Sequence, residues 1–88
     1  MTREDFHSRA VRHESKNVVT FDVRPFGRNQ EDAVTVFLGE QEFQRSAGML
    51  NSSRNIVLVV DDNFLESSQI KGFIQHLNST LRVSIQRG

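Results

Sequence analysis

Residues 56–60 constrain the fold of this chain more than any other segment. They are five consecutive apolar residues, mostly β-branched, and two carboxylates, Asp61 and Asp62, follow at once. An unbroken apolar run of this length indicates a strand that is covered on both faces and has parallel neighbours. Ligands of open α/β sheets bind at the carboxyl ends of such strands. The acidic pair is therefore the first candidate site.

The flanking patterns predict three further strands and two helices. Alternating apolar residues indicate strands at 17–24, 33–38 and 81–86, and helical spacing indicates helices at 40–50 and 63–78. The resulting β-β-α-β-α-β order predicts an α/β fold, a two-layer α/β sandwich with a four-stranded mixed sheet. About eight residues join the first two strands, too few for a parallel crossover, so we expect these strands to pair antiparallel.

The helix predicted at 63–78 has a recognisable start. Asp62 or Asn63 can cap its N-terminus, and Glu66 stands where it would close a capping box on Asn63. Capping alone therefore accounts for the carboxylates that follow residues 56–60. The alternative is that Asp61 and Asp62 bind a metal or a partner.

The N-terminal segment is the least defined part of the chain. Residues 1–16 are highly charged and are expected to be a flexible arm or a short helix, since Phe6 and Ala10 have i, i+4 spacing. Residues 17–88 are expected to form a single α/β domain. Two helices do not easily cover both faces of four strands, so this arm or a second copy should pack on the remaining face. We expect a homodimer.

Composition narrows the classes of function. The chain has 88 residues, no cysteine and a net charge of zero. These features exclude disulfides and thiolate metal sites, and they make nucleic-acid binding an unfavoured reading. No apolar run is long enough to span a membrane, and no apolar signal segment precedes the domain, so we expect a cytoplasmic protein without a membrane contact.

The charge is unevenly distributed. Residues 31–70 carry seven acidic and two basic groups, whereas residues 71–88 carry three basic groups and no acidic one. Such separation favours docking in one orientation, with a partner or with another copy, although ordinary surface scatter also produces it.

One segment resembles a known family. Residues 56–64, with residues 70–73 on the following helix, look like the opening strand and first helix of bacterial response-regulator receiver domains. In that family the acidic pair binds Mg²⁺ near a phosphate-accepting aspartate, so the resemblance implies a metal role for Asp61 and Asp62. It extends over this strand and helix only, and the family's later phosphoacceptor strand has no counterpart after it.

Residues 18–25 resemble that phosphoacceptor strand, as if the order were permuted. If the 17–24 strand is antiparallel to its neighbour, however, Asp22 lies toward the opposite edge of the sheet from Asp61. A six-residue strand spans about 20 Å, which is too far for shared coordination.

The loop after the first predicted strand is a second candidate site. Arg24, Phe26 and Arg28 place an aromatic ring between two cations on a segment stiffened by Pro25 and Gly27. Phe and Arg are common anchors of protein interfaces, so these three residues are predicted to bind a partner. The alternative is that Phe26 folds back over the sheet.

No pattern indicates catalysis. The histidines lack helical metal spacing, and no serine lies in a nucleophile motif. We therefore predict a small non-enzymatic binding or regulatory module that acts through a protein partner and needs no cofactor. Three alternatives stay open: a Mg²⁺-binding receiver-like domain, a small inhibitor or immunity-type protein with an acidic face, and a nucleic-acid module using Arg24 and Arg28.

Overall fold

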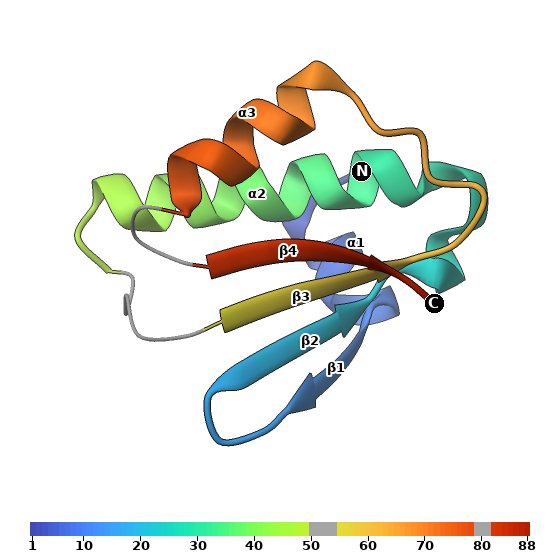
Figure 1. Ribbon diagram of the computed structural model, residues 1–88, viewed down its shortest axis with the longest axis horizontal. Coiled ribbons are helices and arrows are strands. Elements are labelled where there is room, and N and C mark those ends of the chain that lie inside the picture. Colours follow the sequence, from blue (N-terminus) through green and yellow to red (C-terminus); the bar gives the residue numbers. More distant parts are fainter. Residues whose placement is uncertain (50–54, 79–81) are drawn as a thin grey trace.

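The computed structural model of the protein describes residues 1–49, 55–78 and 82–88 (Figure 1). Within these residues the fold is α/β, with three α-helices and one four-stranded mixed sheet. In chain order the elements are α1 (Arg3–Arg9), β1 (Val11–Glu14), β2 (Val18–Asp22), the 3₁₀ helix η1 (Arg24–Asn29), α2 (Gln30–Ser46), β3 (Asn55–Val60), α3 (Ser68–Leu77) and β4 (Arg82–Arg87). The predicted fold class is confirmed, with one helix more than expected.

The sheet has the order β1-β2-β3-β4. β1 pairs antiparallel with β2, whereas β2, β3 and β4 run parallel. From β1 onward the predicted β-β-α-β-α-β order therefore holds, and the first strand is the antiparallel member. That first strand is Val11–Glu14, however, and the strand predicted at 17–24 is the second.

The strand predicted at 33–38 is wrong, because these residues belong to α2. Ala33, Val34, Phe37 and Leu38 are buried, and this i, i+1, i+4, i+5 spacing is the core-facing stripe of a helix. Val34 and the apolar residues two and four positions later also have the two-residue spacing of a strand. The local pattern therefore fits both a helix and a strand. α2 begins ten residues before the helix predicted at 40–50 and ends at Ser46. The turn predicted at 51–54 lies outside the described residues.

The helices cover one face of the sheet. Alternate strand residues point toward them and are buried, among them Val19, Phe21, Ile56, Leu58 and Val83. The chain moves in one direction across the sheet from β2 to β3 to β4. Because parallel crossovers are right-handed, this direction places α2 and α3 on the same face.

No described element covers the opposite face, which we call the open face. It carries the alternate residues of all four strands in register: Val11, His13, Val18, Thr20, Asp22, Asn55, Val57, Val59, Arg82, Ser84 and Gln86. The expectation that the strand at 56–60 is covered on both faces is therefore not met by the described part of this chain.

The N-terminal segment contributes to the core on the helix side. Thr2 caps α1 by accepting a hydrogen bond from the Asp5 backbone N–H at 3.2 Å, and the Asp5 carboxylate accepts one from the Thr2 N–H. This capping box holds a helix of only seven residues in register. Its one buried side chain, Phe6, is fully enclosed.

Four phenylalanines meet at this point. The Phe6 ring lies 5.2 Å from Phe37, 5.7 Å from Phe21 and 5.8 Å from Phe26, measured between ring centroids. Phe21 and Phe37 are also in contact, at 4.8 Å. α1 therefore closes the aromatic part of the core from one side, rather than packing on the open face.

α3 starts later than predicted. Its N-cap is Ser67, whose hydroxyl accepts a hydrogen bond from the Ile70 N–H at 3.2 Å, so the cap predicted at Asn63 is wrong. The Asn63 N–H instead donates to the Asp61 carboxylate, and the Phe64 N–H donates to the Asp61 carbonyl. This turn inserts Phe64 into the core before the helix begins. Leu81, predicted to open the last strand, lies outside the described residues.

Replacement of Phe6 tests the contribution of α1 to the core. Phe6→Ala should lower the free energy of unfolding by about 3–5 kcal/mol, because it opens a cavity among packed rings. Urea unfolding followed by circular dichroism measures the change. Phe43→Ala is the matched control, since Phe43 is 66% exposed on α2, and it should change stability by less than about 0.5 kcal/mol. Equal effects of the two substitutions would show that α1 is not docked.

Candidate functional site at the carboxyl edge of the sheet

β2 and β3 end at the same edge of the sheet. They are parallel, and Asp22 at the end of β2 is level with Val59, two residues before Asp61. The expectation that Asp22 and Asp61 lie at opposite edges is therefore wrong. It depended on a strand at 33–38, and the helix found there supplies the crossover that makes β2 and β3 parallel.

Asp22 and Arg24 form a two-pronged ion pair at this edge. The Arg24 Nε lies 2.9 Å from Asp22 Oδ1, and Nη2 lies 2.7 Å from Oδ2. The Arg24 backbone N–H also donates to the same carboxylate at 3.0 Å. These bonds hold the pKa of Asp22 below its usual value, chiefly through the guanidinium hydrogen bond, and raise the pKa of Arg24.

Gln30 joins the start of α2 to the end of β3. Its fully buried side-chain amide accepts from the Asp61 N–H at 2.9 Å and donates to the Asp61 carboxylate and to the Gly27 carbonyl. The bond from Gln30 is the main reason that the pKa of Asp61 lies below its usual value, and the Asn63 N–H adds to it. Asp61 thus ends β3 and holds the turn after it, as the first interpretation of the sequence expected, but it does not cap α3, whose N-cap is Ser67.

The 3₁₀ helix η1 links these two groups. Gly27 within it has φ +57° and ψ −120°, a conformation that side-chain-bearing residues rarely adopt. This kink aims the Gly27 carbonyl at Gln30, with which it shares a hydrogen bond of 2.7 Å. The chain can therefore turn from β2 into α2 with its buried polar groups paired.

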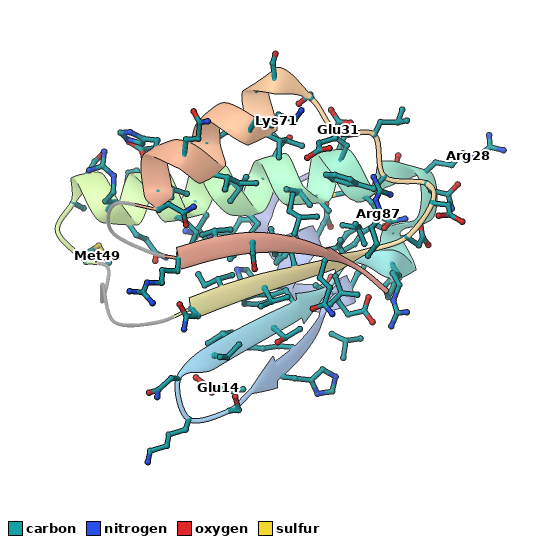
Figure 2. All side chains as sticks on the ribbon, viewed as in Figure 1. Glu14, Arg28, Glu31, Met49, Lys71 and Arg87 are labelled. Carbon is teal, nitrogen blue, oxygen red and sulfur yellow. The ribbon has the colours of Figure 1, made fainter. Side chains whose placement is uncertain are left out.

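The predicted partner-binding residues divide into two kinds. Phe26 is only 3% exposed, stacks on Phe6 and lies under the Arg9 guanidinium at 4.9 Å from the ring centre. It has the folded-back position that the sequence left open, and it is not placed to contact a partner. Arg24 keeps 46% of its side chain exposed, and Figure 2 shows Arg28 projecting away from the body of the molecule.

Asp62 and Arg87 complete the edge. Asp62 is exposed in the turn after β3, while the Arg87 guanidinium donates to the Asp61 carbonyl at 3.3 Å. Arg24 thus lies beside the end of β2, and Arg87 lies beside the end of β3. Each guanidinium retains nitrogen donors that its described contacts do not use.

Sequence reasoning missed Gln30 altogether. It follows a Gly/Pro loop and has no charge, so neither motif nor periodicity marks it out. Its importance comes from Asp61, which is distant in sequence and reaches Gln30 only when β2 and β3 become neighbours. A helix predicted to begin at Gln30, and not at Glu40, would have been needed to suggest that the Gln30 side chain is buried.

Two of the carboxylates at this edge already accept hydrogen bonds from protein donors. Asp22 is engaged by Arg24, and Asp61 receives hydrogen bonds from Gln30 and Asn63. Within residues 1–49, 55–78 and 82–88, no three acidic, histidine or cysteine side chains come together to hold a metal. Metal binding by Asp61 and Asp62 thus stays a prediction of the sequence resemblance.

No protein-family model, curated protein or solved structure matches this chain. Among the described helices, none is both long and apolar enough to cross a membrane.

The Asp22–Arg24 pair should make stability depend on acidic pH. Because the folded-state pKa of Asp22 lies below its ordinary 3.8, the pair stabilises the fold above about pH 4 and loses this effect as the pH falls through the folded value. The urea midpoint should therefore fall on acidification below about pH 4, and both Asp22→Asn and Arg24→Ala should flatten that fall. Combining the two should flatten it no further, and additive effects would contradict the pairing.

A magnesium titration tests the resemblance to receiver domains directly. We expect the amide NMR signals of Asp61, Asp62 and Asn63 to show no saturable shift up to about 10 mM Mg²⁺, because protein donors already occupy the Asp22 and Asp61 carboxylates. Ca²⁺ at the same concentration controls for weak screening effects. A saturable, Mg²⁺-selective shift at these three amides would restore the metal role.

Proposed function

We propose that this protein is a small non-enzymatic binding module that acts through protein contacts made by its open face. The observation that carries the proposal is the arrangement of the layers: α1, α2 and α3 share one face of the sheet, and no described element covers the other. Val57 and Val59 of β3 are half-buried at the centre of that other face, and Val11, 44% exposed on the edge strand, is separated from Val59 by Asp22. An uncovered sheet face with apolar residues at its centre is a candidate interaction site.

The occupant proposed for the open face is a second copy of the chain. The face carries few uncompensated charges, since Asp22 is neutralised by Arg24 and the remaining cation, Arg82, lies at a corner. The acidic residues of α2 and of the loop after β3 belong to other parts of the surface. Two copies related by a two-fold axis would therefore bring valines together without opposing like charges at the centre.

The size of the face fits this role. The molecule measures 32 × 28 × 23 Å and exposes 5468 Å². A standard interface removes about 800 Å² from each partner, roughly one seventh of this surface. One broad side of the molecule is large enough to supply it.

An inhibitor-type acidic face has less support. Glu40 is paired with His7 at 2.9 Å, and Glu42 is paired with Arg45 at 3.1 Å and with His76 at 2.9 Å. These contacts tie α2 to α1 and α3. Two of the acidic groups of α2 therefore serve to hold the helices together.

Sedimentation velocity tests the homodimer. Val57→Asp, which places a charge in the middle of the open face on both copies, should weaken self-association by at least about tenfold. Phe43→Asp makes the same kind of change at a more exposed apolar residue outside that face, and it should leave association unchanged. Circular dichroism establishes that both variants are folded.

Two results would contradict this proposal. One is a wild-type chain that stays monomeric at concentrations up to about 1 mM, at which even an association of about 4 kcal/mol would be detected. The other is a Val57→Asp variant that is folded and associates as the wild type does.

A further inference from the structure

β4 is an edge strand whose outward backbone groups can be identified. The Gly88 N–H donates to the Val60 carbonyl of β3 at 2.9 Å, so even-numbered residues of this strand point toward β3. Odd-numbered residues then point their N–H and C=O groups away from the sheet. The Val83 N–H agrees with this assignment, because it donates to the Asn78 side chain at 2.8 Å instead of to β3.

Two outward backbone N–H groups of β4 have no partner among the described residues. Asn78 satisfies the outward N–H nearest the start of β4, but the outward N–H groups of Ile85 and Arg87 have no acceptor among the described residues. Strand edges of this kind are templates for pairing with another chain. β1, at the other edge, is shorter and carries Arg12, His13 and Glu14, which makes it a poorer template.

Half-buried apolar side chains accompany these donors. Ile85 on β4 and Ile74 on α3 both pack against the core while remaining partly exposed. Ile74 lies one helical turn before Asn78, which reaches the outer edge of β4, so Ile74 faces the same edge. Lys71 precedes Ile74 by three residues and belongs to the same stripe. An added strand would cover both isoleucines.

The edge is basic. Lys71, Arg82 and Arg87 belong to a segment, residues 71–88, that has no acidic residue. Figure 2 shows Lys71 on α3 and Arg87 at the end of β4. Two acidic groups near this segment are already engaged: Glu42 of α2 pairs with His76, and the Asp61 carboxylate accepts from Gln30 and Asn63.

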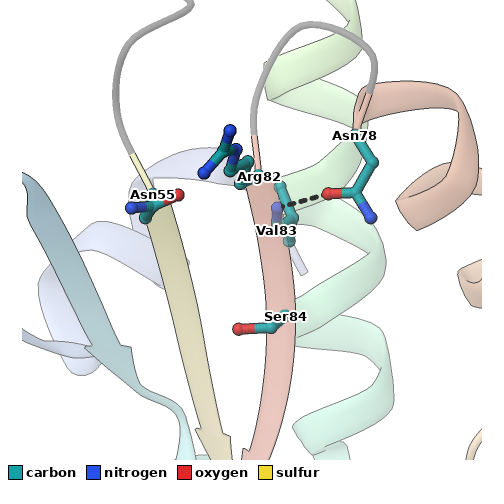
Figure 3. A pocket seen from close by; sticks show the side chains of 5 residues that line it. All are labelled: Asn55, Asn78, Arg82, Val83 and Ser84. Atoms are coloured by element: carbon teal, nitrogen blue, oxygen red, sulfur yellow. Dashed lines mark hydrogen bonds between the residues drawn. The ribbon is translucent and has the colours of Figure 1, made fainter.

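A depression lies at the start of this strand (Figure 3). It has a volume of about 480 Å³ and is lined by Asn55, Asn78, Arg82, Val83 and Ser84. The guanidinium of Arg82 and the amides of the two asparagines provide donors for a carboxylate, and the Asn78 oxygen is used by Val83.

We propose that the outer edge of β4 binds an extended, acidic segment of another protein as a fifth strand of the sheet. The Ile85 and Arg87 N–H groups would pair with its backbone, one of its apolar residues would cover Ile85 and Ile74, and one of its carboxylates would meet Arg82. A second copy of β4 is less suited to this edge than an acidic segment, because it would add further cations to an edge that is already basic. The inference concerns the outer edge of β4, which shares Arg82 with a corner of the open face, and the pairing at Ile85 and Arg87 does not depend on the homodimer.

Two seven-residue peptides test the proposal, one alternating Glu with Val and the other alternating Lys with Val. We expect the Glu peptide to shift the amide NMR signals of β4 in a saturable way and to slow hydrogen exchange at Ile85 and Arg87. The Lys peptide should bind at least tenfold more weakly. Arg82→Glu should weaken binding of the Glu peptide by about tenfold, as expected for the loss of a charge-assisted contact.

Substitution at position 87 separates backbone pairing from charge. Arg87→Ala removes the guanidinium and keeps the N–H, whereas Arg87→Pro also removes the outward N–H without touching the bonds to β3. The proline variant should bind the Glu peptide at least fivefold more weakly than the alanine variant. NMR dispersion shows whether both variants are folded. Val57→Asp should not affect peptide binding, which distinguishes failure here from failure of the homodimer.

Three outcomes would overturn the inference. Equal binding of the Glu and Lys peptides would remove the charge argument, and equal binding by the alanine and proline variants would remove the added strand. Slow exchange at Ile85 and Arg87 that depends on protein concentration without peptide would show that a second copy occupies the edge instead.

Discussion

The parallel pairing of β2 with β3 is the constraint on which the rest of the structure depends. It requires a crossover between the two strands, and the segment from Arg24 to Ser46 supplies one as η1 and α2. The pairing brings Asp22 and Asp61 to one edge, which allows Gln30 to bridge the start of α2 and the end of β3. It also fixes where the helices lie, because the next crossover moves in the same direction and right-handedness puts α3 beside α2.

The polar side chains at the carboxyl edge of the sheet bind mainly to other groups of the same chain. Arg24 holds Asp22, and Gln30 and Asn63 hold Asp61, so the groups that looked most reactive in the sequence stabilise the turns between elements. The surfaces that lack such partners among the described residues are of another kind: the centre of the open face around Val57 and Val59, and the hydrogen-bonding edge of β4. Both are suited to protein contact, and they have different requirements, one apolar and nearly neutral, the other basic and dependent on backbone pairing.

Errors in the prediction came from local patterns that fit two structures. Val34 and the apolar residues two and four positions after it alternate as in a strand, but Ala33 and Phe37 complete a helical stripe, and burial against the sheet selects the helix. A contact with the core also moved the start of α3. Phe64 is buried before the helix begins, so the helix starts only after Ser67, which caps it. In both cases a long-range contact decided between alternatives that are close in local energy.

The sequence by itself determined the class of fold, the central strand at residues 56–60 and the position of carboxylates at its end, because hydrophobic periodicity is a local property. Only the tertiary structure decided which strand is antiparallel, that Phe26 and Phe6 share a core, and that Asp22 lies near the edge that bears Asp61. These features depend on the direction of each crossover and on contacts between residues far apart in the chain. The order of residues along the chain does not specify the crossover directions or these long-range contacts before the strands are paired.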